Sequence, residues 1–292
     1  MFEAGPDFHK VRILRPGGYA GRAIPHSQHT PSTLAGFYEH TYATGARQAE
    51  LGARWRALGA RGKADHVVTL CRRAALEPDG TLEVGCGDGA LLCELRRRSF
   101  GGPLFGVEIA PAAVRIAAGR PEVERVDLFD GRHLPFPQGA FELGVLSHVL
   151  EHVPDPPALL GEVARVCRAV VVEVPLERNL SARRASRRRM AGDVGHLQRL
   201  DRAAARRLVA AAGLRIAGEL DDPLPRAVHR FFARSRSAAL AGDLKWASRA
   251  AAHRLAPPFA RRLFTVHYAC LCLPRDLPRD QLPGGWRRRA AA

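Results

Sequence analysis

The sequence predicts an α/β protein with a doubly wound, mostly parallel sheet. Short apolar runs alternate with amphipathic helical segments between about residues 80 and 220, which is the rhythm of such a sheet. One run, Ala169–Val174, is nearly all valine, which is typical of a strand buried on both faces. The length of 292 residues is sufficient for one large α/β domain with additions.

The strands are expected where the apolar runs occur. In chain order they are Thr81–Val84, Leu104–Glu108, Val123–Leu128, Phe141–Leu146, Ala169–Val174, Leu214–Leu220 and Phe264–Leu273. Helices are expected between them, over Ala90–Arg98, Pro111–Ala118, Pro157–Arg168 and Arg202–Ala212. Pro111 suits the first position of its helix, whereas Asp201 is a typical N-cap and Gly213 a typical terminator.

The remaining segments define the expected domain organisation. Residues 1–63 are an N-terminal arm and a helical segment, 64–273 are the α/β domain, and the Pro/Arg-rich residues 274–292 are a mobile tail. Two insertions, at about 176–200 and 221–262, follow late strands. Because ligands of open α/β sheets bind beyond the carboxyl ends of the strands, we expect these insertions to select the substrate.

Composition excludes several classes of protein. The chain has 45 basic and 29 acidic residues, a net charge of +16, but the charge is spread along the sequence. The chain has no long apolar stretch free of charged residues, so we expect no membrane-spanning helix. The first residues do not have the pattern of a secretory signal. The six cysteines form no CxxC pair, so we expect buried free thiols in a cytoplasmic protein.

A glycine-rich loop follows the first expected strand, in the run Leu82-Glu83-Val84-Gly85-Cys86-Gly87-Asp88-Gly89-Ala90. Alternate glycines between a strand and a helix allow close approach of the backbone to a ligand. The run also satisfies the dinucleotide pattern GxGxxA, and the acidic Glu108 follows about 20 residues later. An NAD site is therefore one interpretation of this loop.

Three features argue against NAD. Glu83 places a carboxylate inside the strand, the third glycine, Gly89, comes at two-residue spacing, and Asp130 adds another acceptor after the third strand. Carboxylates suit a cationic ligand that carries adenosine better than they suit a pyrophosphate. S-adenosylmethionine has those properties.

The glycine run resembles motif I of the class I S-adenosylmethionine-dependent methyltransferases. Four further segments resemble the type 11 and type 12 methyltransferase domains, so the resemblance covers about residues 64–220. They are Phe105–Ile109, Asp130–Phe136, Leu150–Pro156 and Gly195–Leu200. The resemblance implies a Rossmann-like fold of the class I type, whose final antiparallel strand would be Phe264–Leu273. Two departures are Glu142, where Asp is usual, and the absence of a Pro-Gly-Gly turn before Ala169.

The resemblance also implies roles for individual residues. Glu83 and the loop containing Gly85, Cys86, Gly87 and Gly89 would hold the methionine end of the cofactor. Glu108 would accept hydrogen bonds from the ribose, and Ile109 would pack on the adenine. Asp130, with Gly131 beside it, would receive the adenine amino group. Ser147 and His148 would lie where cofactor and acceptor meet.

Methyl transfer from a sulfonium needs an aligned nucleophile and a group that removes its proton. His148 and His196 are candidate bases, because histidine titrates near neutral pH, but a structural role is equally open for each. Glu151 and His152 are expected to act through hydrogen bonding or capping. No metal site is expected.

The predicted function is methyl transfer from S-adenosylmethionine to an oxygen or nitrogen of a small-molecule acceptor. Alternatives are a non-catalytic cofactor-binding regulatory protein, an NAD-dependent oxidoreductase and an RNA methyltransferase. The basic cluster Arg183, Arg184, Arg187, Arg188 and Arg189 could attract RNA, although no aromatic residues interleave with it. Asp155-Pro156-Pro157 lacks the aromatic residue of nucleic-acid amine methyltransferases, since Ala158 follows it.

Overall fold

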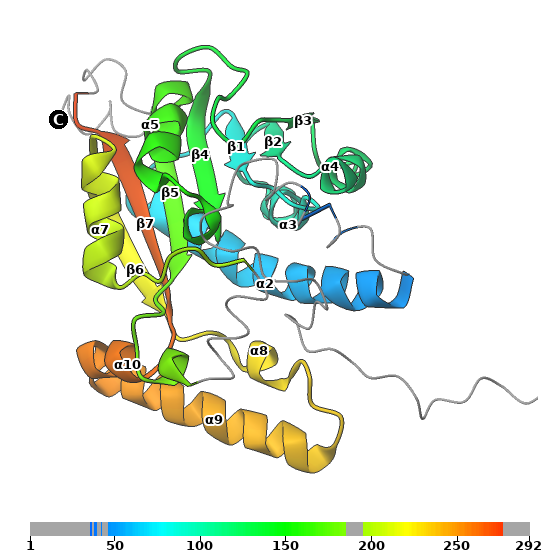
Figure 1. Cartoon of the computed structure of the whole chain (residues 1–292), viewed down its shortest axis with the longest axis vertical. Coiled ribbons are helices and arrows are strands. Elements are labelled where there is room, and N and C mark those ends of the chain that lie inside the picture. Colours follow the sequence, from blue (N-terminus) through cyan, green and yellow to red (C-terminus); the bar gives the residue numbers. More distant parts are fainter. Residues whose placement is uncertain (1–35, 37, 40–41, 43–45, 185–194, 277–292) are drawn as a thin grey trace, which may run out of the picture.

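The computed structural model describes residues 36, 38–39, 42, 46–184 and 195–276. Within these residues, seven strands form one sheet in the order β3-β2-β1-β4-β5-β7-β6 (Figure 1). The strands are β1 (Thr81–Val84), β2 (Leu104–Glu108), β3 (Arg125–Leu128), β4 (Phe141–Ser147), β5 (Cys167–Pro175), β6 (Leu214–Asp222) and β7 (His267–Pro274). Only β7 runs antiparallel to its neighbours, β5 and β6. The predicted class and its inserted antiparallel strand are confirmed.

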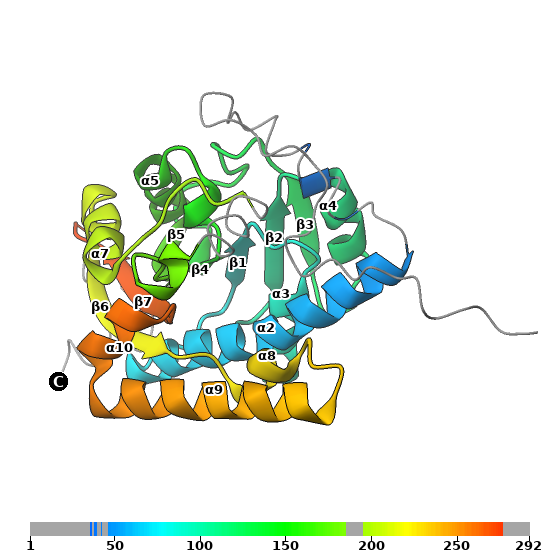
Figure 2. The ribbon, with the colours of Figure 1, turned by 60° about the horizontal axis from the view of Figure 1, so that its bottom comes forward.

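Helices cover both faces of the sheet (Figure 2). The α-helices in the described part of the chain are α2 (Ala46–Arg73), α3 (Ala90–Arg97), α4 (Pro111–Ala118), α5 (Pro156–Val166), α7 (Arg202–Ala211), α8 (Arg226–Arg230), α9 (Arg236–Leu255) and α10 (Pro257–Leu263). Buried residues of α2, α3 and α4 share one core cluster with β4, β5 and β7. Buried residues of α5 and α7 share the other. The expected N-cap of α7 is confirmed, since Asp201 accepts from the N–H of Ala204 at 2.7 Å.

Several expected boundaries were wrong by a few residues. β3 begins at Arg125, because Val123 still belongs to the preceding turn and donates its N–H to Arg120. β5 begins at Cys167, which pairs with Phe141 on β4, so α5 passes directly into the strand. This direct passage explains why no Pro-Gly-Gly turn is needed there.

The last two strands also differ from the expected spans. β6 continues to Asp222, where it pairs with His267, the first residue of β7. Phe264 precedes the strand because it is the C-cap of α10, where its N–H donates to the carbonyl oxygen of Ala260. All six cysteines are buried free thiols, as expected.

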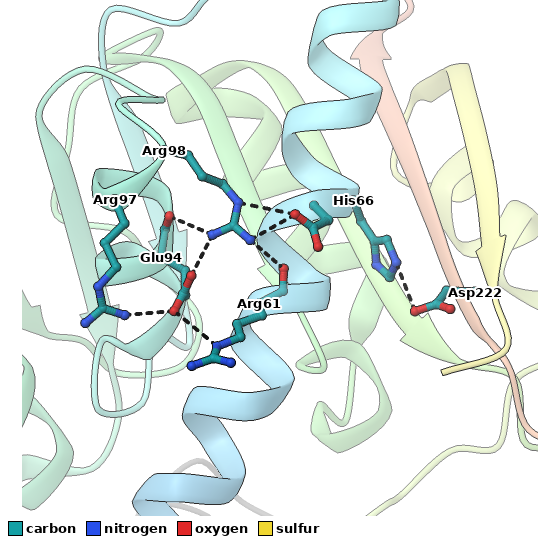
Figure 3. Close-up of polar contacts among 7 residues, drawn as sticks. Arg61, His66, Glu94, Arg97, Arg98 and Asp222 are labelled. Carbon is teal, nitrogen blue, oxygen red and sulfur yellow. Dashed lines mark hydrogen bonds and ion pairs between the residues drawn. The ribbon is translucent and has the colours of Figure 1, made fainter. Parts of the chain in front are cut away.

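Helix α2 is fastened to its neighbours by charged groups (Figure 3). The carboxylate of Glu94 on α3 accepts from Arg97 at 2.8 Å and from Arg98 at 2.6 Å. Arg98 also donates to Asp65 on α2 at 2.9 Å. The expected domain boundary between residues 63 and 64 lies inside this helix, and we therefore expect the helical segment and the sheet to fold as one unit.

The second insertion forms a helical layer beside α2. Helices α8, α9 and α10 connect β6 to β7, and α8 lies between α2 and α9 in both views (Figures 1 and 2). Residues 185–194 of the first insertion lie outside the described residues, as do the N-terminal arm over 1–32 and residues 277–292 of the tail. No helix in the described ranges has the length and apolarity needed to cross a membrane.

Candidate active site

A cavity of about 1050 Å³ lies at the edge of the sheet where the parallel strands end. Its wall includes the residues that follow β1, β2, β4 and β6, together with the first residue of the antiparallel β7. Side chains of α2, α8 and α9 line the opposite side. The cavity therefore lies between the strand ends of the sheet and the helical layer of the second insertion.

The glycine loop makes one end of this cavity. Gly85 and Gly87 have φ of +73° and +53°, which side chains rarely tolerate. A Cβ on Gly85 would lie 2.7 Å from Cγ2 of Val149, and one on Gly87 would lie 2.5 Å from the hydroxyl of Tyr42. The loop therefore needs glycine at both positions for its own packing.

Two buried carboxylates stand beside the loop. Glu108 accepts from the N–H groups of Gly87 at 2.9 Å, Ile109 at 2.8 Å and Ala110 at 3.1 Å. A carboxylate can accept about four hydrogen bonds, so it retains room for a further donor. Glu83 is 4% exposed, and its Oε2 has no hydrogen-bond partner among the described residues. Burial raises the pKa of Glu83, because the charged form is poorly solvated there.

Most of the expected cofactor residues line the cavity, but Gly89 and Asp130 do not. Those that do are Glu83, Gly85, Cys86, Gly87, Glu108, Ile109, Gly131 and Ser147. Gly89 instead forms the N-cap of α3. The carboxylate of Asp130 accepts from the N–H groups of Arg132 and His133, both at 2.7 Å, and so holds its own loop.

The pairing of strands gathers charged side chains at the other end of the cavity. Ser147 pairs with Glu173 across β4 and β5, while His267 pairs with Pro175 on β5 and with Asp222 on β6. His148 follows β4 directly with φ +60°, a left-handed conformation that is strained for a residue other than glycine.

Glu173 is the centre of this group and is only 1% exposed. Its Oε1 is 3.0 Å from Nδ1 of His267 and 3.5 Å from Nε2 of His148, and its Oε2 is 3.2 Å from Nδ1 of His66. Burial alone would raise the pKa of Glu173, but the three histidines outweigh it and lower the pKa well below its usual value.

A second group joins it through Glu151 of the 3-10 helix η3 (Leu150–His152). Oε1 of Glu151 is 3.2 Å from Nδ1 of His148 and 3.9 Å from Nε2 of His152. Burial would raise the pKa of Glu151, but His148, His152 and His196 together lower it to about 2. His196 is held separately, with its Nδ1 2.8 Å from Oε2 of Glu177.

Both candidate bases, His148 and His196, therefore line the same cavity. The same cavity is also lined by residues not predicted from the sequence, namely Lys63 and His66 on α2, Asp222 and His267. No local pattern marks these residues, because their proximity depends on the order of the strands and the path of α2.

An aromatic wall completes the cavity. Trp55 on α2 lies 5.0 Å from Phe231 and 5.3 Å from Phe232, measured between ring centroids. These three rings join α2 to the second insertion and give the cavity an apolar side.

Of the basic cluster, Arg183 ends the 3-10 helix η4 (Ser181–Arg183) and Arg184 follows it, both exposed. Arg187, Arg188 and Arg189 lie outside the described residues.

The region that contains the glycine loop and the buried carboxylates also matches a known protein family. Residues 59–218, more than half of the chain, match the methyltransferase domain family. The chain belongs to this family, and its sheet is that of the class I S-adenosylmethionine-dependent methyltransferases. The cofactor of the class is S-adenosylmethionine.

Individual relatives are similar over part of their length. The chain is 28% identical to ajmaline N-methyltransferase of Rauvolfia serpentina over 36% of this chain and 39% of that protein. It is 26% identical to a ubiquinone biosynthesis O-methyltransferase of Paracidovorax citrulli over 42% of this chain and 56% of that protein. The matched region thus spans about half, or less, of these relatives.

A solved structure shares the fold. Geranyl diphosphate C-methyltransferase from Streptomyces coelicolor A3(2) superposes with a TM-score of 0.52 at 15% identity, covering 73% of this chain and 78% of that one.

Proposed function

We propose that this protein transfers the methyl group of S-adenosylmethionine to an oxygen or nitrogen of a small-molecule acceptor. The observation that carries the proposal is the single cavity that joins the glycine loop and its carboxylates to a histidine-rich, aromatic-walled end. The names of the relatives, which include N- and O-methyltransferases, support the acceptor atoms. When bound, the cofactor supplies an electrophilic methyl group on a cationic sulfur.

The residues at the loop end fit this cofactor. Glu83 offers a buried carboxylate oxygen without a partner among the described residues, and such a group is costly unless a ligand satisfies it. A cationic amino group would do so. Glu108 has room for a hydroxyl donor, and Ile109 and Gly131 offer a flat apolar and backbone surface for a purine.

The acceptor would bind between the aromatic wall and the histidines. We infer that His196 removes the acceptor's proton, because Glu177 holds its Nδ1 and leaves Nε2 as the basic nitrogen. His148 is a weaker candidate, since Glu151 lies against its Nδ1, while Nε2 faces His267 and Glu173.

Calorimetric binding tests the cofactor site. We expect S-adenosylmethionine and S-adenosylhomocysteine to bind, and Glu108→Ala to weaken both by about tenfold or more, the loss of one charge-assisted hydrogen bond. Glu124→Ala, an exposed glutamate outside the cavity, is the matched control and should bind as the wild type does.

Preference for NAD, or no binding of either adenosyl compound, would overturn the proposal. Transfer of a labelled methyl group to a panel of phenols and amines then tests the acceptor. Full turnover by His196→Ala at neutral pH would exclude that histidine as the base.

A further inference from the structure

Three ligand atoms converge at the histidine-rich end of the cavity. They are Nε2 of His148, Nδ1 of His267 and Oε1 of Glu173. The two nitrogens are 3.2 Å apart, and Oε1 lies 3.0 Å from His267 and 3.5 Å from His148. Ligands about 2.1 Å from one metal ion lie about 3.0 Å apart in octahedral and about 3.4 Å apart in tetrahedral geometry. The triangle of these three atoms therefore has the edges of one face of a coordination polyhedron. A point about 2.1 Å from all three lies about 1 Å out of their plane.

The groups behind these atoms orient them as metal ligands. Oε1 of Glu151 is 3.2 Å from Nδ1 of His148, so Nε2 is the nitrogen of His148 that faces the other two ligand atoms. Nδ1 of His66 is 3.2 Å from Oε2 of Glu173, and Nε2 of His66 is 3.2 Å from Asp222. Charged groups placed behind metal-binding histidines and carboxylates in this way help to hold the ligands in position.

Charge also favours a cation at this point. Without one, Nε2 of His148 and Nδ1 of His267 both face the same oxygen, Oε1 of Glu173, which is 1% exposed. A single proton on His267 can satisfy only part of this arrangement, whereas a divalent ion satisfies all three atoms.

We propose that His148, Glu173 and His267 bind a divalent first-row transition-metal ion, with zinc as the probe. Two histidines and one carboxylate are a common donor set for such ions, and the coordination positions left over admit an exogenous ligand. His148 and His267 line the cavity while Glu173 lies behind them, so these positions face the cavity. An oxygen of the acceptor could occupy one of them; that use rests on the proposed function, but metal binding does not.

The neighbouring group of Glu151, His152 and His196 is less suited to a metal. Nδ1 of His152 is 3.1 Å from the carbonyl oxygen of Gly195, and Nδ1 of His196 is held by Glu177. Nε2 of His152 is 3.9 Å from Glu151. One ring nitrogen of His152 and one of His196 therefore already have a protein partner, and the distance from Glu151 to His152 is longer than any edge of the first triangle.

The test uses the untagged full chain, stripped with a chelator and dialysed against Zn²⁺ or Co²⁺ without cofactor or acceptor. Bound metal is measured by elemental analysis, and the coordination of Co²⁺ by its visible absorption. We expect one tightly bound equivalent in the wild type, lost in His267→Gln and Glu173→Gln. Glu151→Gln should weaken binding about 10- to 100-fold.

Controls separate this site from other histidines. His253→Ala, on α9 outside the cavity, and His196→Ala should both keep the bound equivalent. Far-UV circular dichroism reports folding, and His148→Gln replaces any variant that fails this check.

No tightly bound equivalent in the wild type, or an equivalent that persists in folded His267→Gln, overturns the metal site. Loss in His196→Ala with retention in His267→Gln assigns the metal to the other group and also overturns it. A protein that binds the metal but transfers no methyl group contradicts only the proposed function.

Discussion

At the residue scale, three backbone positions beside the cavity adopt the left-handed conformation. Gly85, Gly87 and His148 all have positive φ, and each follows the end of a strand that faces the ligand site. Such conformations cost about 1–3 kcal/mol for a residue with a side chain, and they persist where the surrounding structure holds them. Close approach of the loop to its ligand depends on them.

The substitution Gly85→Ala tests this strain. We expect it to lower the free energy of unfolding by about 1–3 kcal/mol and to weaken S-adenosylhomocysteine binding by about tenfold or more, because the new Cβ meets Val149. Gly161→Ala is the matched control: a Cβ there meets nothing within 4 Å on α5 and should leave stability unchanged or raise it by up to about 1 kcal/mol. Chemical denaturation and calorimetry measure both, and equal effects of the two substitutions would contradict the argument.

The residues that could be predicted from the sequence are those that act within a few positions of one another. The loop from Gly85 to Gly87 and the strand-end Glu108 carry their chemistry in local order. Asp130 shows the limit of that reasoning. The sequence predicts that Asp130 follows the third strand, but not where its carboxylate points. In the structure the N–H groups of Arg132 and His133 and the ring of His133 occupy the carboxylate oxygens that a ligand would need.

At the scale of elements, the antiparallel β7 determines what the sequence could not reveal. Alternating apolar runs predicted all seven strands, and the resemblance implied the inserted one. The meeting of His267 with Glu173 and Asp222 nevertheless follows from register across three strands, which apolar periodicity does not encode. His66 joins them from α2, which continues past the expected end of the helical segment at residue 63.

Helix α7 is tied to β6 by Glu219. Its carboxylate accepts from Arg202 and Arg206 on α7 and from the hydroxyl of Tyr268 on β7, the last at 2.6 Å. Burial would raise the pKa of Glu219, but these three donors outweigh it and lower the pKa to about 2.

Because the folded-state pKa of Glu219 is below its usual value of about 4.5, its contribution to stability is present above pH 4.5 and is lost as the pH falls toward 2. We expect Glu219→Gln to be less stable than the wild type at pH 7, with the difference narrowing steadily below pH 4.5. Urea denaturation of both proteins over this range measures it. A difference that stays constant to pH 3 would show that the charge of Glu219 is not responsible.

At the scale of the whole molecule, the sheet and the second insertion contribute different walls of the cavity. The sheet carries the glycine loop and the carboxylates. In the structure the second insertion is the whole connection between β6 and β7, residues 223–266, and it adds the wall with Phe231 and Phe232. The ends of this insertion are adjacent, since Asp222 pairs with His267. The insertion can therefore be removed without stretching the chain.

Replacing residues 223–266 by an Asn-Gly turn should preserve the sheet, because that turn matches the twist of an antiparallel pair. We expect S-adenosylhomocysteine to bind still, while kcat/KM for methyl transfer falls by at least about 100-fold as the acceptor loses its positioning. Circular dichroism, calorimetry and the labelled-methyl assay give the three readouts. Unchanged methyl transfer would place the acceptor elsewhere.

The position of β7 also affects the order of assembly on the ribosome. This strand lies between β5 and β6 although it is the last of the seven to be synthesised. Until residues 267–274 leave the exit tunnel, β6 has no partner and the hydrogen-bonding edge of β5 stays open. A nascent chain that stalls before this point leaves β6 and one edge of β5 unpaired. Completion of the sheet and arrival of His267 at the cavity are then a single late event.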